Sequence, residues 1–156
     1  MRIIVMRHGE ATFLDNDRIL SLIGQKEALD TAMQLKSFLG SVNRIICSPK
    51  TRAVQTASIV KSVLAESSDL DYLSDLTPSG DVDSVISYVE AVCKPDDTVL
   101  LVSHLPLVEY LSYEFVHMKR CSPSFKTACA LVIDIDGRQT DFKRFITPFM
   151  EPVSFE

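Results

Sequence analysis

The sequence lacks any long apolar stretch and any excess of positive charge. No segment reaches the roughly 18 to 20 apolar residues that a membrane-spanning helix needs, and the first apolar run, 3–5, is soon followed by Arg7, unlike a signal peptide. The 16 lysines and arginines are outnumbered by 21 aspartates and glutamates, which gives a net charge of -5. This balance argues against a nucleic-acid-binding protein, which would need a basic face. We therefore expect a cytoplasmic protein with neither a membrane nor a nucleic acid as its partner.

Several motifs of metal and nucleotide chemistry are missing as well. No HxH, HExxH or paired-cysteine pattern supplies the three or four ligands that a zinc site needs. There is no GxxxxGK(S/T) loop for nucleotide phosphates and no GxSxG elbow for a serine nucleophile. We therefore expect neither a metal nor a cofactor. Three of the four cysteines lie inside apolar runs, which predicts buried, reduced thiols rather than disulfides, at Cys47, Cys93, Cys121 and Cys129.

Apolar runs and helical patterns alternate along the chain, and no repeat, low-complexity tract or linker interrupts them. We therefore expect one domain over residues 1–156. The clear apolar runs are continuous, as in parallel strands buried on both faces. They predict strands at Arg2 to Met6, Arg44 to Cys47 and Thr98 to Ser103, with a weaker one at Leu70 to Leu73. Apolar residues at helical spacing predict helices between them, around Ala28, Ala32, Leu35 and Leu39 and around Ala53, Ala57, Val60 and Leu64.

Two further patterns complete the predicted fold. Ser48-Pro49 predicts a helix start. Ser48 could cap this helix or face a functional site at the strand end, and we favour the cap. Thr127 to Ile135 and Gln139 to Ile146 predict a terminal hairpin, with Asp136-Gly137 in or near its turn. Strands that alternate with helices imply an α/β domain with three α/β/α layers. We expect a mostly parallel central sheet that ends in this C-terminal antiparallel hairpin.

Two histidines and two arginines follow the predicted parallel strands at their carboxyl ends. Arg7 and His8 come after the first strand, Arg52 shortly after the second, and His104 after the third. In open α/β sheets ligands bind at these strand ends, so we expect the four side chains to meet at one rim. Arg52 lies near the start of its helix, where the dipole disfavours a cation, so a bound anion explains it better than stability does. The third histidine, His117, lies near a helix end and is predicted to be a surface residue.

This set of side chains suits phosphoryl transfer. Arginine forks bind phosphate oxygens bidentately and stay charged, and two arginines with two histidines can position and neutralise a phosphoryl group without a metal. A histidine nitrogen can attack phosphorus and carry the group covalently. His8 must then be neutral at the attacking nitrogen, with its other ring nitrogen donating a hydrogen bond, for example to a backbone carbonyl.

Three segments in order resemble the histidine phosphatase superfamily, which has the phosphoglycerate mutase-like fold. They are "MRHGE" at 6–10, "CSPKTRAVQTA" at 47–57 and "VLLVSHLPLV" at 99–108. The short length of the chain, together with "LTPSGDVDSV" and "SHLPLVEYL", is most similar to the SixA-type phosphohistidine phosphatases. The resemblance covers nearly the whole chain, to about Pro148.

The resemblance also implies roles for individual residues. His8 corresponds to the phosphorylated nucleophile, and Arg7, Arg52 and His104 correspond to the rest of the phosphate pocket. Arg18 is similar to an additional arginine that contacts phosphate in SixA-like proteins, although an exposed loop position explains this residue equally well.

The resemblance leaves the general acid open. Many members of the superfamily carry an acid between the second and third segments, which protonates the leaving oxygen of an ester. The candidates here are Asp75, Asp81 and Asp83, with Glu10 as a further proton carrier, but Asp81 and Asp83 are explained equally well as helix caps. Without a dedicated acid, an easily expelled leaving group such as the protonated imidazole of phosphohistidine is favoured. The short chain leaves little sequence for a lid, which favours a pocket open to a protein surface.

The leading hypothesis is a metal-independent phosphatase for phosphohistidine on a protein, such as a phosphotransfer domain or carrier in signal transduction. It would act through a phosphohistidine intermediate at His8. The first alternative is a small-molecule phosphomonoesterase of the same fold that acts on a phosphorylated metabolite. The second is a non-catalytic phosphate-binding module, which would not need both His8 and His104.

Overall fold

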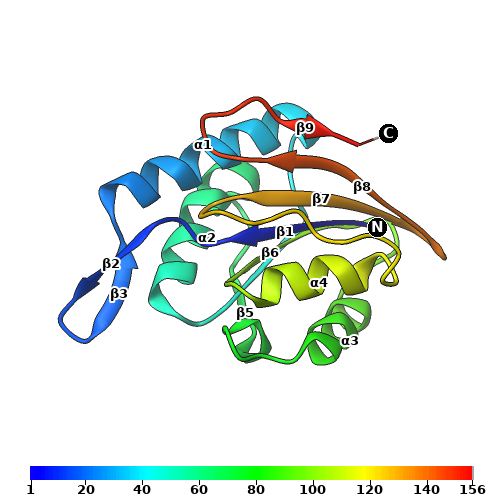
Figure 1. The fold of residues 1–156 in the computed structure, drawn as a ribbon, viewed down its shortest axis with the longest axis horizontal. Helices are drawn as coiled ribbons and strands as arrows, with labels where there is room; N and C mark the ends of the chain where they lie inside the picture. Colours follow the sequence, from blue (N-terminus) through cyan, green and yellow to red (C-terminus); the bar gives the residue numbers. More distant parts are fainter. Residues whose placement is uncertain (156) are drawn as a thin grey trace.

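A central sheet with helices on both faces forms the body of the protein (Figure 1). The computed structural model describes residues 1–155. The strands of this sheet are β1 (Arg2–Arg7), β4 (Arg44–Cys47), β5 (Asp71–Tyr72), β6 (Thr98–Ser103), β7 (Ala130–Asp136), β8 (Gln139–Ile146) and β9 (Val153–Ser154). The helices are α1 (Leu22–Leu39), α2 (Thr51–Leu64), α3 (Val82–Val92), α4 (Leu107–Phe115) and the short 3-10 helix η1 (Ser74–Leu76).

The predicted parallel strands form one half of the sheet, whose strand order is β5-β4-β6-β1-β7-β8-β9. β6 pairs parallel with β1 on one side and with β4 on the other, and β4 pairs parallel with β5. The predicted bounds of β4 and β6 agree with the structure, whereas β1 extends one residue further, to Arg7. Because these strands run in the same direction, the segments that follow them leave the sheet at one edge.

The other half of the sheet is antiparallel. The predicted terminal hairpin is confirmed as β7 and β8, and β7 also pairs antiparallel with β1. Gly137 in the hairpin turn has φ of 60°, in the left-handed region that glycine adopts without steric penalty. β7 begins at Ala130 rather than at Thr127, and β9 adds an edge strand that the sequence does not predict. The predicted class, a three-layer α/β fold with a mixed sheet, is confirmed.

Alternate residues of β1 face two separate cores. Ile3 and Val5 belong to the core under α3 and α4, whereas Ile4 and Met6 belong to the core under α1 and α2. Every second side chain of a strand points to the same face, so a continuous apolar run fills both layers at once. Figure 1 shows the two pairs of helices on opposite sides of the sheet.

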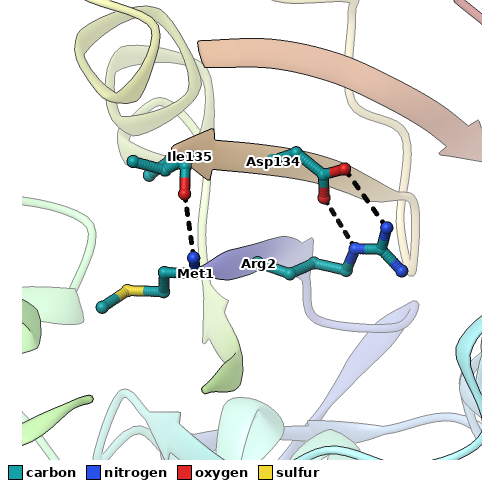
Figure 2. A network of polar contacts seen from close by, with 4 residues as sticks. All are labelled: Met1, Arg2, Asp134 and Ile135. Carbon is teal, nitrogen blue, oxygen red and sulfur yellow. Dashed lines mark hydrogen bonds and ion pairs between the residues drawn. The ribbon is translucent and has the colours of Figure 1, made fainter. Parts of the chain in front are cut away.

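The amino end of β1 is attached to β7 by polar contacts (Figure 2). The amino group of Met1 donates to the carbonyl oxygen of Ile135 at 2.8 Å. The Arg2 guanidinium donates to both carboxylate oxygens of Asp134, at 2.6 and 3.2 Å. A bidentate pair of this kind adds geometric specificity to its energy, so it supports the register between the two strands.

A separate hairpin, which the sequence does not predict, projects beyond the edge of the main sheet (Figure 1). Its strands are β2 (Ala11–Leu14) and β3 (Asp17–Leu20), which pair only with each other. The Thr51 hydroxyl of α2 donates to the Asp17 carboxylate at 2.5 Å, and the last residue of β3 donates its backbone N–H to the Gln55 side chain at 2.7 Å. These contacts fix the hairpin against α2.

Two of the predicted helix starts can be compared with the structure. Of the two predicted caps, Asp81 and Asp83, the N-cap of α3 is Asp81, whose carboxylate accepts from the Ser84 N–H at 2.9 Å. α2 instead begins at Thr51, with Lys50 as its N-cap and no capping side chain. The prediction of Ser48 as this cap is therefore wrong, and its hydroxyl is bound elsewhere. Within residues 1–155, no helix combines the length and apolar character needed to cross a bilayer.

All four cysteines are free thiols, but they are not all buried. Cys47 and Cys129 are buried as predicted, and burial raises the pKa of the Cys47 thiol to about 12. Cys93 is half-buried, and Cys121 is exposed in the segment after α4. The prediction of burial is thus wrong for Cys121, since a loop leaves its side chain without a layer to cover it.

Candidate active site

The three motifs meet at the carboxyl edge of the parallel strands, as predicted. The backbone N–H of His8, directly after β1, donates to the carbonyl oxygen of Ser103 at the end of β6, at 3.0 Å. The backbone N–H of Ser48, directly after β4, donates to the carbonyl oxygen of Val102 in β6, also at 3.0 Å. The rings of His8 and His104 consequently lie edge to face, with their centroids 5.0 Å apart.

Gly9 serves close approach of two backbone segments rather than a turn. Its φ is not in the left-handed region, so its backbone conformation alone does not require a glycine. A Cβ on Gly9 would lie 2.5 Å from the carbonyl oxygen of Gly24 in α1, and a Cβ on Gly24 would lie 2.0 Å from that of Glu10. The Gly9 N–H also donates to the hydroxyl of Thr56 in α2 at 3.1 Å. The segment after His8 is therefore held tightly against both helices.

His8 is held as a neutral ring with one free nitrogen. Its Nδ1 lies 2.7 Å from the carbonyl oxygen of Gly9. Because a carbonyl can only accept, Nδ1 carries the hydrogen and Nε2 keeps its lone pair. Burial lowers the pKa of His8 to about 4, against the opposing effect of the Gly9 hydrogen bond, and the charges of Arg52, Arg7 and Arg18 lower this pKa further. The ring is therefore uncharged at neutral pH.

His104 is the second buried, neutral histidine of the rim. It is 2% exposed, and its Nε2 lies 2.8 Å from the hydroxyl oxygen of Ser48. Its Nδ1 is buried and has no hydrogen-bond partner in the described part of the chain. Burial is the main cause that lowers the pKa of His104 to about 3, followed by His8 and Arg52.

Three arginines around these rings have no carboxylate partner. Within residues 1–155 the ion pairs shorter than 4 Å lie elsewhere, and the Nε atoms of Arg7, Arg18 and Arg52 are buried without a hydrogen-bond partner. Arg7 donates from Nη1 to the backbone carbonyl of Phe125 at 3.1 Å. Burial lowers the pKa of Arg7 and that of Arg52. The three half-buried guanidinium groups therefore keep donors that could bind an anion.

Arg18 reaches the rim from the projecting hairpin and not from an exposed loop. It lies in β3 opposite Phe13 of β2, with its guanidinium carbon 5.8 Å from the centre of the Phe13 ring. The side chain is half-buried, and its charge lowers the pKa of both His8 and His104. The structure thus brings the Arg18 charge to the two histidines.

Two of the candidate acids are bound at helix starts. Asp81 is exposed, and hydrogen bonds from Ser84 lower its pKa. Glu10 is exposed, and its carboxylate accepts from the hydroxyl of Ser21, the N-cap of α1, at 3.0 Å. Both carboxylates therefore stabilise helix termini, where a negative charge is favourable.

Asp75 is the candidate acid whose element contacts the third motif. It belongs to η1, next to Leu76, whose carbonyl accepts from the Ser103 hydroxyl at 2.6 Å. Ser103 directly precedes His104, so η1 borders the rim. The charges that most affect the pKa of His8 belong to arginines, and those that most affect the pKa of His104 belong to His8 and to basic side chains. Asp75 is not among them.

The rim contains one polar residue that the sequence does not single out, Thr56 in "CSPKTRAVQTA". It is fully buried, accepts from Gly9 and donates to the carbonyl of Arg52 at 2.8 Å. A threonine on the apolar face of a predicted helix is the signal that could have revealed it. His117 is exposed just after α4, as predicted. No cluster of three or more His, Cys, Asp or Glu side chains within residues 1–155 could hold a metal ion.

The fold and the three motifs define a protein of the histidine phosphatase class. No family model matches the chain. The chain is 35% identical over 140 residues to the phosphohistidine phosphatase SixA of Escherichia coli (strain K12), a match that covers 87% of this chain and 86% of that protein. It is 35% identical over 153 residues to a SixA homolog of Haemophilus influenzae, covering 90% and 92%.

The fold is also similar to that of a solved SixA structure. The protein histidine phosphatase SixA complexed with tungstate has a TM-score of 0.86 and 33% identity to this chain, covering 95% of this chain and 97% of that one. The chain belongs to the SixA phosphohistidine phosphatase family.

Proposed function

We propose that this protein hydrolyses phosphohistidine on a protein, without a metal, through a phosphorylated His8. The observation that carries the proposal is the state of the His8 ring. The Gly9 carbonyl fixes the hydrogen on Nδ1, and burial lowers the pKa to about 4. Nε2 is therefore a neutral nucleophile at neutral pH.

The unpartnered donors of the rim support a phosphoryl group as the target. Four of the buried side-chain nitrogens without a partner in residues 1–155 belong to Arg7, Arg18, Arg52 and His104. A phosphoryl group offers oxygens to all of these donors, and arginine forks match them bidentately. The tungstate held by the related SixA is also a tetrahedral oxyanion, which is consistent with this assignment.

The reaction follows from these groups in two steps. Nε2 of His8 attacks phosphorus, an N–P bond to His8 forms, and the N–P bond of the substrate phosphohistidine breaks with the substrate imidazole protonated. Water then attacks the phosphorus, the His8 N–P bond breaks and inorganic phosphate leaves. Arg7, Arg52 and His104 neutralise the charge on the transferring oxygens in both steps.

The state of the carboxylates favours this leaving group over an alkoxide. Asp81 and Glu10 are exposed and hydrogen-bonded at helix starts, and His104 is neutral at working pH. An ester needs a proton donor for its leaving oxygen, whereas a protonated imidazole leaves without one. The site therefore suits phosphohistidine better than a phosphate ester.

Exposed apolar side chains beside the site support a protein-borne substrate. Phe13 of β2 is 77% exposed and Leu22 at the start of α1 is 76% exposed, and Phe13 lies opposite Arg18. Large apolar side chains at a functional edge are typical of protein contact surfaces. A phosphotransfer domain or carrier fits this surface, whereas a small metabolite would leave it unused.

A substrate panel tests this assignment. We expect a phosphohistidine-bearing phosphotransfer protein to be turned over faster than phosphoserine, sugar phosphates and p-nitrophenyl phosphate. Phe13→Ser should slow the phosphoprotein several-fold and leave phosphoimidazole turnover unchanged, because only the protein can contact the hairpin. Faster turnover of several esters than of the phosphoprotein would reject the substrate class.

A labelling experiment tests the intermediate. Brief mixing with a ³²P-labelled phosphoprotein, quenched at alkaline pH where phosphohistidine survives, should label the chain on His8. His8→Ala should remove the label and reduce kcat/KM by on the order of 10³-fold or more, since it removes the nucleophile. No label and no turnover with any substrate would support the non-catalytic module instead.

The small-molecule phosphomonoesterase remains the second candidate because Asp75 lies in η1, beside the third motif. It requires a general acid, so Asp75→Asn, Asp81→Asn or Glu10→Gln should depress ester hydrolysis strongly. We expect all three variants to keep phosphohistidine turnover within about threefold of the parent chain.

We place this activity in the cytoplasm, in a signalling route that uses phosphohistidine. The free thiols support this location, in particular the exposed Cys121, because disulfides form in oxidising compartments. Fractionation of cells that express the tagged chain would test it, and recovery of the protein outside the cytoplasm would reject it.

A further inference from the structure

Ser48 is a buried serine whose hydroxyl joins the second motif to the third. It is fully buried in the turn between β4 and α2. Its hydroxyl oxygen accepts from the backbone N–H of Lys50 at 3.2 Å and lies 2.8 Å from Nε2 of His104. The backbone of His104 is fixed as well, since its carbonyl accepts from the N–H of Val108 in α4 at 3.0 Å.

The donors and acceptors around the Ser48 hydroxyl indicate which ring nitrogen of His104 carries the proton. A hydroxyl has one hydrogen to donate and two lone pairs, and one lone pair is taken by the Lys50 N–H. If Nε2 carried the proton, the Ser48 hydroxyl hydrogen would have no acceptor in the described part of the chain. An unsatisfied buried donor of this kind costs about 1–3 kcal/mol. Before a substrate binds, the other tautomer also leaves one donor unpaired, because Nδ1 of His104 has no partner in residues 1–155. Once a phosphoryl oxygen lies at Nδ1, only one arrangement satisfies every atom: Ser48 donates to Nε2, and the proton of His104 is on Nδ1.

The free nitrogen of His104 fits the same assignment. Nδ1 is buried without a protein partner, and the ring lies 5.0 Å from that of His8. With a hydrogen, Nδ1 is a donor for a phosphoryl oxygen. As a bare lone pair it would repel that oxygen. The tautomer of His104 therefore determines whether this side of the rim attracts or repels the transferring group.

We propose that Ser48 is a positioning residue that locks His104 in its Nδ1–H tautomer, so that the ring donates a hydrogen bond to the phosphoryl group during transfer. The inference rests on the proposed function and deepens it. A free histidine side chain prefers the Nε2–H form, so both rim histidines would be held in the minor tautomer, each by its own partner. The Gly9 carbonyl sets His8 for attack, and the Ser48 hydroxyl sets His104 for donation.

A hydroxyl suits this task better than a carboxylate would. A carboxylate partner stabilises the protonated imidazolium, whereas a serine orients the ring and leaves it neutral. His104 then stabilises charge as a neutral donor and cannot supply a whole proton to a leaving group. This agrees with a substrate whose leaving group needs none.

Long-range ¹⁵N–¹H NMR of the ¹⁵N-labelled chain at pH 7, recorded with saturating inorganic phosphate, tests the tautomer directly. We expect Nδ1 of His104 at the chemical shift of a protonated nitrogen and Nε2 at that of an unprotonated one. The exposed His117 provides an internal reference for a side chain without this constraint. A protonated Nε2 in His104 would overturn the proposal. Because this measurement needs no turnover, its failure is distinct from failure of the labelling experiment on His8.

Kinetics of Ser48 variants test the consequence. Ser48→Ala should shift His104 toward the Nε2–H form and reduce kcat roughly tenfold with little change in KM, since the donated bond matters most in the transition state. Ser48→Thr, which keeps a hydroxyl, should restore both the tautomer and most of kcat. Ser112→Ala is the matched control, because Ser112 is also fully buried but donates to Val108 within α4. An unchanged tautomer and kcat in folded Ser48→Ala would overturn the role of Ser48.

Discussion

β1 carries an arginine at each end, and the two are bound in opposite ways. At the amino end, the Arg2 guanidinium donates to both oxygens of Asp134 (Figure 2), and these hydrogen bonds raise the pKa of Arg2. At the carboxyl end, Arg7 has a backbone carbonyl of Phe125 as its partner, and burial lowers its pKa. Arg2 is paired with a carboxylate, whereas Arg7 keeps an unpartnered Nε that we propose binds the phosphoryl group.

The surroundings of the two ends extend this contrast. A hollow of about 290 Å³ beside Arg2 is lined by several aspartates, among them Asp96 and Asp97. Around His8, by contrast, the charges that lower its pKa all belong to arginines. The arginines at the carboxyl end form no ion pair within 4 Å in residues 1–155, which is what the proposed phosphoryl ligand would change. The amino end holds the sheet together.

Acidification should produce the largest effect and should act on the carboxyl end first. The folded pKa values of His8 and His104 are about 4 and about 3, below the unfolded value of about 6.5. Between these values the unfolded chain binds protons that the folded chain does not, so stability is lost as pH falls below about 6.5. From pH 7 to pH 5 we expect a loss of about 2 kcal/mol for each histidine, measured by urea unfolding. His8→Asn should remove its share of this slope, and a flat stability profile over this range would contradict the assignment.

Replacing Arg7 by lysine should separate charge from geometry at the carboxyl end. Lysine keeps the charge but loses the bidentate fork, so we expect kcat/KM for the phosphoprotein to fall about 100-fold. Arg2→Lys, at the other end of the same strand, is the matched control and should leave kcat/KM unchanged. Equal losses in both variants would mean that the two ends do not differ in function.

Much of this contrast can be predicted from the sequence. The continuous apolar runs at 2–6, 44–47 and 98–103 predict buried parallel strands, because their residues fill both cores at once. Once those strands are parallel, His8 and His104 must leave the sheet at one edge. Arg52, near the start of a helix, stands out because its charge opposes the helix dipole.

The rest depends on contacts that leave no periodic pattern. β2 is mostly exposed and pairs only with β3, so its sequence has no alternation of apolar and polar residues that would predict a strand. For the same reason, the sequence is equally consistent with Arg18 in an exposed loop. Ser48 and Pro49 have the composition of a helix start, but the helix begins later and the hydroxyl binds His104 instead. Local preference was overridden here by a partner that lies far away in the sequence.

Replacing Arg18 should have an intermediate effect on activity, because this arginine adds one charge to the rim from a hairpin outside the main sheet. We expect Arg18→Ala to reduce kcat/KM roughly tenfold through the loss of one charge-assisted contact. The pKa of His8 should rise, since the Arg18 charge lowers it in the parent chain. Arg138→Ala, in the exposed turn between β7 and β8, is the matched control. A shift in the acid limb of the kcat/KM profile would report the change in pKa, and an unshifted limb with unchanged kcat/KM would remove Arg18 from the site.

The smallest effect should come from breaking the ion pair between Arg2 and Asp134. Arg2 and Asp134 are each about one-third exposed, at 32% and 33%, so solvent screens the pair and its coupling should be roughly 0.5–1 kcal/mol. A double-mutant cycle with Arg2→Ala and Asp134→Asn, followed by urea unfolding, measures this coupling. Raising the salt concentration should weaken it, and kcat/KM should stay constant throughout. A loss of activity in Arg2→Ala without a loss of stability would mean that the amino end also serves the reaction, and the division of β1 into a structural end and a functional end would fail.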